Sequence, residues 1–161
     1  MNDYTVHRID ALETSSAWLL PALASRIALF SARIQREPNS EKSARYFIAR
    51  LVMADKAVQA VAGLRNPLSG SPYDDMVGHS IAEIVKVDDQ DVCFVHQVEV
   101  DPGYSSLLDK FVLEADTWCK SMQIKSMRTE VIDTIPEAVW LRAMRRFDWK
   151  LVSRVMERSV R

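Results

Sequence analysis

Two side chains on one apolar stretch, His96 and Glu99, have the chemistry of a general base. A neutral imidazole or a carboxylate accepts the proton that a nucleophile loses, directly or through a water molecule. Both lie within Val92–Val100, whose β-branched residues predict a strand. The sequence therefore offers two candidate bases on one predicted strand.

The alternation of side chains along this strand predicts where each candidate points. Val98 is expected on one side, with Gln97 and Glu99 on the other. The same pattern is taken to place His96 beside Phe94 and Val98. For each candidate a structural role stays open: His96 as a hydrogen-bonded core residue, and Glu99 as a solvated or ion-paired strand residue.

The remaining metal-ligating residue types predict no metal site. Cys93 and Cys119 match no metal-ligand spacing and are expected to be a reduced, structural pair. The acidic stretch 88–91 lacks the loop glycine and distal glutamate of a calcium motif. His7 and His79 have no evident partner in the sequence.

Length and composition indicate one ordinary globular domain. The chain has 161 residues, 48% of them apolar and 27% charged. The polar N-terminus predicts no signal peptide, and no apolar run approaches the roughly 20 residues of a membrane span, so a cytoplasmic location is expected. Residues 74–101 carry eight acidic residues and one lysine (net −7), and residues 142–161 carry seven basic and two acidic residues (net +5). No aromatic-interleaved basic stripe accompanies the basic end, so nucleic-acid binding is not predicted.

The elements after the central strand have clear sequence signals. A turn at residues 101–104 leads into a helix capped by Ser105 or Ser106, with apolar residues three and four apart as far as Met122. Residues 125–132 predict a strand, and 136–147 a helix with Pro136 in its first turn. Residues 149–160 predict a terminal strand pair or one long strand.

The first half of the chain is less clear. A strand is predicted over residues 4–9, then a capping box at Asp10 and Glu13, and a helical region to Gln35 that Pro21 splits in two. For residues 41–64 we predict a hairpin, with strands at 46–52 and 57–64; a continuous helix over 41–62 is the alternative. Residues 66–78 predict a loop, and residues 80–87 remain open between a helix and a strand.

Three stretches follow one another in an order typical of a known fold. They are Tyr46-Phe-Ile-Ala with 58–64; Val98-Glu-Val-Asp-Pro102 with Leu107-Leu108 and the helix after it; and 124–131 with Ala138, Leu141 and Phe147. In this order they resemble the second and third strands, the central strand with its cofactor helix, and the fifth strand with its helix in the GNAT acyl-CoA N-acyltransferases. The resemblance implies an α/β (α+β) fold with a mixed central β-sheet flanked by helices on both faces, as one domain over residues 1–161.

The resemblance also implies acetyl-CoA as the possible cofactor, and no other. The positions that it assigns to cofactor binding are Val98, Val100, Gly103, Tyr104, Ser105, Ser106 and Arg142. In the family, the turn before the cofactor helix carries glycines and a basic or polar residue, and its backbone amides hold the pyrophosphate. Here the turn Gly103-Tyr-Ser-Ser106 is shorter, with one glycine and no basic residue. The resemblance therefore implies a phosphate loop that is eroded.

A second departure from the family concerns the acid. The family commonly places a tyrosine on the helix after the fifth strand, where its hydroxyl protonates the departing thiolate. One alignment puts Arg142 at this position and another puts Met144 there, and neither supplies a phenol. The base that removes a proton from the amine would be Glu99 or His96.

Three functions stay open on the sequence alone. The first is a GNAT-like binding protein with little or no acetyl transfer, of a kind that occurs in tailed bacteriophages as virion or host-interacting proteins, which implies a protein partner. The second is an active N-acetyltransferase with a non-standard loop, and the third is an unrelated adaptor domain. Trp140 and the terminal strand would suit a homodimer surface. In the family, a splayed gap between the strands at 92–100 and 125–132 admits the pantetheine arm.

Overall fold

The computed structural model describes residues 2–130, 136–152 and 155–160. Its strands are β1 (Tyr4–Arg8), β2 (Val58–Arg65), β3 (Met76–Val87), β4 (Gln90–Val100), β5 (Ser126–Glu130), β6 (Lys150–Val152) and β7 (Val155–Ser159). Its helices are α1 (Thr14–Ala17), α2 (Leu20–Arg33), α3 (Ser40–Val52), α4 (Pro72–Asp75), α5 (Leu107–Ser121) and α6 (Glu137–Arg145).

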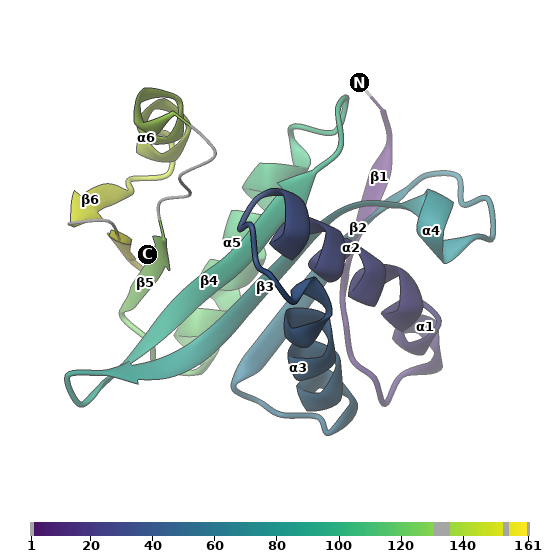
Figure 1. Ribbon diagram of the computed structural model, residues 1–161, viewed down its shortest axis with the longest axis horizontal. Coiled ribbons are helices and arrows are strands. Elements are labelled where there is room, and N and C mark those ends of the chain that lie inside the picture. The colour runs from purple at the N-terminus through teal and green to yellow at the C-terminus, as the bar shows by residue number, and fades with distance from the viewer. Residues whose placement is uncertain (1, 131–135, 153–154, 161) are drawn as a thin grey trace.

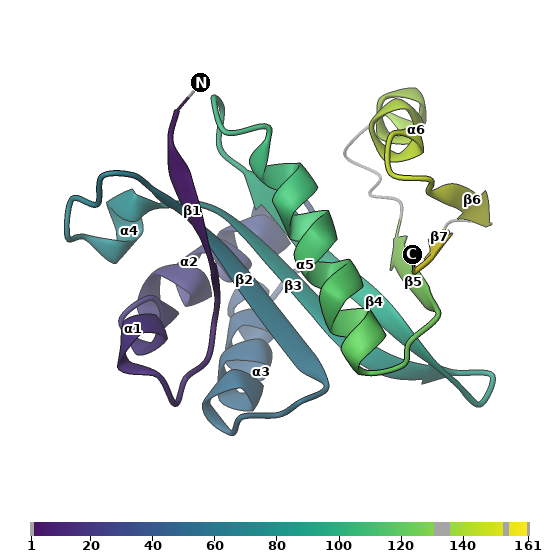
Figure 2. The ribbon, with the colours of Figure 1, turned by 180° about the vertical axis from the view of Figure 1, so that it is seen from behind.

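One mixed sheet organises the chain. Within the described residues its strand order is β1-β2-β3-β4-β5-β7-β6, and every neighbouring pair is antiparallel except β4 with β5. Helices α2 and α3 lie on one face of the sheet and α5 lies on the other (Figures 1 and 2). The predicted fold class, a mixed sheet with helices on both faces, is confirmed.

Several predicted elements are confirmed because their local signals agree with their packing. Pro21 lies in the first turn of α2, where the missing amide hydrogen costs nothing. The predicted amphipathic helix is α5, with Phe111, Ala115 and Trp118 on its buried face. The terminal strand signal corresponds to the pair β6 and β7.

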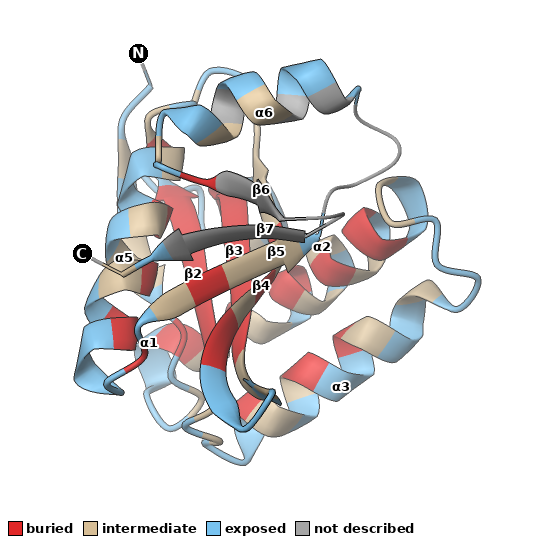
Figure 3. Cartoon of the chain, turned by 90° about the vertical axis from the view of Figure 1, so that its left-hand side faces the viewer, coloured by how far each residue is buried: buried red, intermediate tan, exposed pale blue. Residues whose placement is uncertain are grey.

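The hairpin predicted for residues 41–64 is wrong, and so is the continuous helix. Residues 40–52 form α3, whose buried residues Ala44, Phe47 and Leu51 recur three and four apart against α2. The chain then enters β2, which is buried from Val58 to Leu64 between the two helical layers (Figure 3). Tyrosine and isoleucine in 46–52 favour a strand in isolation, but packing on α2 decides for a helix. The second strand of the sheet is therefore 58–65.

The open region 80–87 is part of the long strand β3, so the third strand of the sheet is 76–87. β3 pairs with β2 on one side and β4 on the other, and most of its residues are buried (Figure 3). Residues 80–87 do not form a helix, because β-branched residues fit the centre of this sheet. The predicted loop at 66–78 contains α4 and the start of β3.

β4 and β5 are paired only over a short stretch. Cys93 lies beside Met127 and Phe94 beside Arg128, and among the described residues β5 makes no ladder pairing with β4 beyond these. β4 continues to Val100, and no strand among the described residues pairs with its second half on this side, which we call the open edge of β4. This opening corresponds to the gap that the resemblance implies between the strands at 92–100 and 125–132. Within the described residues, no helix has both the length and the apolar character needed to cross a membrane.

Candidate functional site

β4 carries a bulge at His96. Gln97 pairs with Ile81 of β3 and Val95 pairs with Ala82, which leaves His96 with no residue opposite it. A bulge inserts one residue into the strand and shifts the alternation of the side chains after it. The shift decides which face of the sheet each candidate residue reaches.

His96, Gln97 and Glu99 all face α2 and α3. The imidazole centroid of His96 lies 5.0 Å from the ring centroid of Phe47 on α3, and Gln97 donates a hydrogen bond to a backbone carbonyl of α2 at 3.3 Å. Glu99 accepts a hydrogen bond from Arg33 of α2 at 3.0 Å. All three side chains therefore belong to the helical layer formed by α2 and α3.

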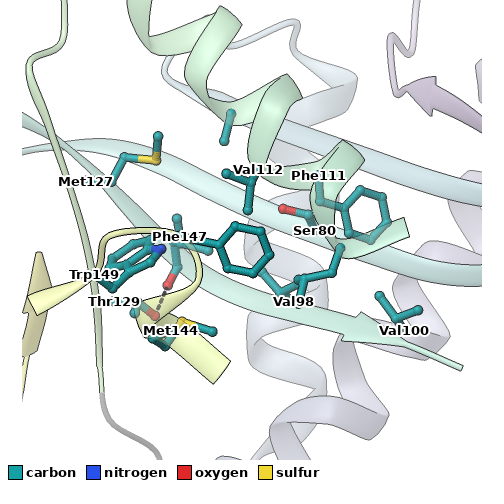
Figure 4. Close-up of a pocket in the computed structure, with 13 residues that line it drawn as sticks. Ser80, Val98, Val100, Phe111, Val112, Met127, Thr129, Met144, Phe147 and Trp149 are labelled. Carbon is teal, nitrogen blue, oxygen red and sulfur yellow. Dashed lines mark hydrogen bonds between the residues drawn. The ribbon is translucent and has the colours of Figure 1, made fainter. Parts of the chain in front are cut away.

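Val98 and Val100 face the other way, toward α5, so the prediction that His96 and Val98 share a side is wrong. They line a cavity of about 220 Å³, which we call the α5 pocket. Figure 4 shows side chains of β4, α5 and the segment 144–149 converging on this space. Its lining consists of Ser80, Val95, Val98, Val100, Leu108, Phe111, Val112, Ala115, Met127, Thr129, Met144, Phe147 and Trp149.

A second cavity, of about 590 Å³, lies against the connection between α2 and α3, and we call it the α3 pocket. It is more polar than the α5 pocket. Its lining consists of Ile34, Gln35, Arg36, Glu37, Ser43, Phe47, Val85, Phe94, Val95, His96, Gln97, Thr129 and Glu130. Val95 and Thr129 line both pockets, and the Thr129 hydroxyl donates to the Val95 carbonyl at 2.9 Å. The two pockets therefore lie on either side of Val95 and Thr129, where β4 and β5 separate.

His96 is held by Glu83 of β3. Its Nε2 lies 2.9 Å from a carboxylate oxygen of Glu83. Because an ionised carboxylate only accepts hydrogen bonds, Nε2 carries the hydrogen and Nδ1 keeps a free lone pair. Glu83 also accepts a hydrogen bond from Tyr46 at 2.7 Å and pairs with Arg50. The result is a neutral histidine whose tautomer is fixed by a buried carboxylate.

The pKa values of this pair fit a base at neutral pH. Burial pushes the pKa of Glu83 upward, but hydrogen bonds from Tyr46, Arg50 and His96 hold it below its ordinary value. Burial lowers the pKa of His96, although the hydrogen bond to Glu83 opposes this. Glu83 is therefore ionised and His96 uncharged at neutral pH.

Glu99, the other candidate base, is tied to α2. Arg26 lies 3.4 Å from it and Arg33 lies 3.0 Å from it, and it lines neither pocket. Its buried neighbour His79, for which the sequence suggested no partner, has Nε2 3.0 Å from the Gln97 amide oxygen. Burial lowers the pKa of His79 to about 4.

Comparison with proteins of known structure identifies the fold of this chain. No protein-family model matches the sequence, and no curated protein matches it significantly. NAA60 of Arabidopsis thaliana, solved with a bisubstrate analogue, superposes with a TM-score of 0.70 over 99% of this chain and 100% of that one, at 10% identity. The PaiA N-acetyltransferase of Thermoplasma acidophilum, solved with coenzyme A, gives 0.61 over 98% and 99% at 13% identity. An acetyltransferase of the GNAT family from Staphylococcus aureus gives 0.59 over 98% and 100% at 16% identity.

This chain has the GNAT fold. The superpositions span nearly the whole chain. The sequence placed the second and third strands of the GNAT fold too early. They are β2 and β3, and α3 takes the place that the prediction gave to a strand.

The turn before α5 is closed by its own backbone hydrogen bonds. The amides of Leu107 and Leu108 donate to carbonyls within the turn at 2.9 and 3.2 Å. Gly103 is exposed, and a side-chain carbon added there would lie 2.9 Å from the amide nitrogen of the Asn2 side chain. The first turn of α5 also carries Asp109, whose carboxylate would repel a phosphate.

The other positions assigned to the cofactor are divided by the fold. Val98 and Val100 line the α5 pocket, whereas Gly103, Tyr104, Ser105 and Ser106 do not. Arg142 is exposed on α6 and lies outside the lining, while Met144 is part of it. No tyrosine lines the α5 pocket within the described residues.

Sequence reasoning missed Glu83, which holds His96, and also Tyr46 and Arg50, which hold Glu83. Assigning 80–87 as a strand would have placed Glu83 across from β4 and close to His96. The contribution of α3 had no such signal, because Tyr46 and Arg50 reach Glu83 only through the tertiary packing of α3.

Proposed function

We propose that this chain is an N-acyltransferase that moves an acyl group from a thioester to an amine, with His96 as the general base. The observation that carries the proposal is that Val95 and Thr129 belong to the walls of both pockets, with His96 in the lining of the α3 pocket. A transferase needs its two substrates to meet in fixed geometry, which supplies much of the rate acceleration. The α5 pocket would hold the thioester and the α3 pocket the amine.

Backbone groups of β4 support a thioester arm in the α5 pocket. The Asp101 amide donates to Val77 of β3 at 2.8 Å, and residues of an antiparallel strand alternate in the direction of their backbone groups. The amides of Val98 and Val100 therefore point to the open edge of β4. There they can bond the amide groups of the arm as a neighbouring strand would.

The chemistry needs one proton acceptor in the α3 pocket. His96 Nδ1 accepts a proton from the amine as the amine nitrogen bonds to the acyl carbon. The carbon–sulfur bond then breaks, and the sulfur leaves with the electron pair and takes a proton from water. Glu83 stabilises the imidazolium that forms, in the way a carboxylate orients a catalytic histidine.

Release of free thiol tests the proposal. The protein is mixed with acetyl-CoA, acetyl-pantetheine or an acetylated carrier protein, each with a panel of primary amines. We expect amine-dependent thiol release with at least one donor. A complete absence of release from every donor and amine contradicts the proposal.

Glu83→Gln is expected to lower kcat by at least about 10-fold. The substitution removes the carboxylate that orients the His96 imidazole and stabilises its protonated form. Glu83 also raises the pKa of His96. The acidic limb of the kcat profile should therefore move to lower pH, a shift that a purely structural role would not produce. The control is Glu114→Gln, which removes an exposed carboxylate paired with Arg8. An unchanged limb would count against Glu83 as a positioning residue.

The pH dependence of the unaltered protein follows from the burial of His96. Burial lowers the pKa of His96 below the ordinary histidine value of about 6.5. The base form therefore persists as the pH falls through 6.5, and kcat/KM should decline only at more acidic pH. A steady-state profile measures this, and a decline centred above pH 6.5 would disagree with His96 as the base.

A second candidate function is a GNAT-fold binding protein without transfer activity. The poor fit of the turn before α5 to a diphosphate favours it, together with the lack of a tyrosine in the described lining of the α5 pocket. It predicts no thiol release, and no binding of acetyl-CoA tighter than about 100 μM, roughly −5.5 kcal/mol, in calorimetry. Binding of a partner protein would then be its activity.

A further inference from the structure

The α5 pocket, where the thioester donor is proposed to bind, fits a thioester arm but not a nucleotide. The α5 pocket measures about 220 Å³, below the roughly 300–1,000 Å³ of pockets that enclose a whole drug-sized ligand. Its lining is apolar except for Ser80 and Thr129. Such a slot suits a narrow aliphatic arm whose amides bond to the open edge of β4.

The place next to the arm is closed to a diphosphate. Two amides at the start of α5 are used within the turn, and the carboxylate of Asp109 already occupies the first turn of the helix. Asp109 is held there by Arg146, whose Nη2 lies 2.6 Å from it. This ion pair links the start of α5 to the end of α6, on either side of the α5 pocket. A negatively charged group here would compete with Asp109 for Arg146 and for the helix terminus.

The surface beside the pocket is basic. Arg142 and Arg145 are exposed on α6, two residues before and one residue after Met144, which lines the α5 pocket. Arg146 lies next to them and is half exposed despite its pairing. A group of arginines attracts an acidic partner and speeds its association by electrostatic steering. The charge therefore favours a macromolecular donor with acidic residues around its arm.

We infer that the acyl donor is an acidic carrier protein that presents the acyl group on a phosphopantetheine arm, and that the nucleotide of CoA contributes nothing to recognition. The inference rests on the proposed function and names its donor class. In this arrangement the arm enters the α5 pocket, and the carrier lies on Arg142 and Arg145. Asp109 excludes a second phosphate.

Donor comparison tests the inference directly. Thiol release is measured with one amine and three donors: acetyl-CoA, acetyl-pantetheine and an acetylated acidic acyl carrier protein. We expect kcat/KM for acetyl-CoA to lie within about threefold of that for acetyl-pantetheine, and kcat/KM for the carrier to be at least 10-fold higher than both. A 10-fold advantage of acetyl-CoA over acetyl-pantetheine would overturn the inference, and so would a carrier no better than free acetyl-pantetheine.

Charge-reversal variants test the surface separately. Arg142→Glu combined with Arg145→Glu should lower kcat/KM for the carrier at least 10-fold and leave that for acetyl-pantetheine unchanged. Lys56→Glu, an exposed change in the turn before β2, is the matched control. Equal losses with both donors would contradict a role in carrier docking.

Binding separates this inference from the proposed function. Titration of the carrier with and without its acetylated arm, followed by fluorescence anisotropy, needs no turnover. If the carrier binds at least 10-fold more tightly than acetyl-CoA, and only when it bears its arm, the donor class is supported. If no thiol is released in that case, only the proposed transfer activity is contradicted. Absence of arm-dependent binding overturns the inference, while thiol release from acetyl-CoA would leave the transferase itself intact.

Discussion

Replacing His96 with glutamine is expected to lower kcat about 10²- to 10⁴-fold, the range that a positioned general base contributes. Glutamine keeps a polar side chain near Glu83 but cannot accept the amine proton at neutral pH. KM for the thioester should change little, because His96 lines the α3 pocket and not the α5 pocket. Steady-state thiol release at saturating donor measures the loss.

Two further variants make this result specific. His7→Gln, on β1 and away from both pockets, should leave kcat unchanged. Glu99→Gln removes the other candidate base; because Glu99 is paired with Arg26 and Arg33, we expect a smaller loss and an unaltered acidic limb. A kcat for His96→Gln within twofold of the unaltered protein would exclude His96 as the base. A 10²-fold loss confined to Glu99→Gln would assign the role to Glu99.

Leu23→Ala is expected to lower the free energy of unfolding by about 2–5 kcal/mol. Leu23 is fully buried on α2, in the cluster that joins α2 and α3 to the sheet. Truncation removes its apolar contacts and leaves a cavity between close-packed layers, which relax only in part. Urea unfolding followed by far-UV circular dichroism measures the difference.

The control for this prediction lies on the same helix. Leu29 is 50% exposed, so Leu29→Ala should change the free energy of unfolding by less than about 0.5 kcal/mol. Because both substitutions change helix propensity equally, the difference between them reports burial alone. If the two variants unfold at the same urea concentration, α2 does not pack as described.

The elements nearest the site were predictable where local signals were strong. β4 is β-branched, α5 has an unbroken apolar stripe, and the short turn between them is visible from its single glycine, Gly103. These elements are fixed by residues that are neighbours in the chain, so periodicity and turn chemistry describe them.

Residues 41–64 could not be assigned in this way. A helix with Tyr46 and Phe47 and a strand rich in alanine such as β2 both run against the average preferences of their residues. Burial outweighs these preferences, which amount to less than about 1 kcal/mol per residue. Only the layer formed by α2 and α3 over the sheet shows which state buries more apolar surface.

The sequence by itself determined the order of elements after β4, the amphipathic face of α5, and His96 and Glu99 as the candidate bases. The tertiary structure determined which charged and apolar groups surround His96 and which surround Glu99. His96 lies beside Phe94 in the wall of the α3 pocket, and the bulge brings Glu99 to the same side of β4. The pairing of β3 with β4 brings Glu83 to His96, while Arg26 and Arg33 reach Glu99 from α2. The physical reason is that the pKa and accessibility of a base depend on charges and packing from distant parts of the chain, which no local spacing records.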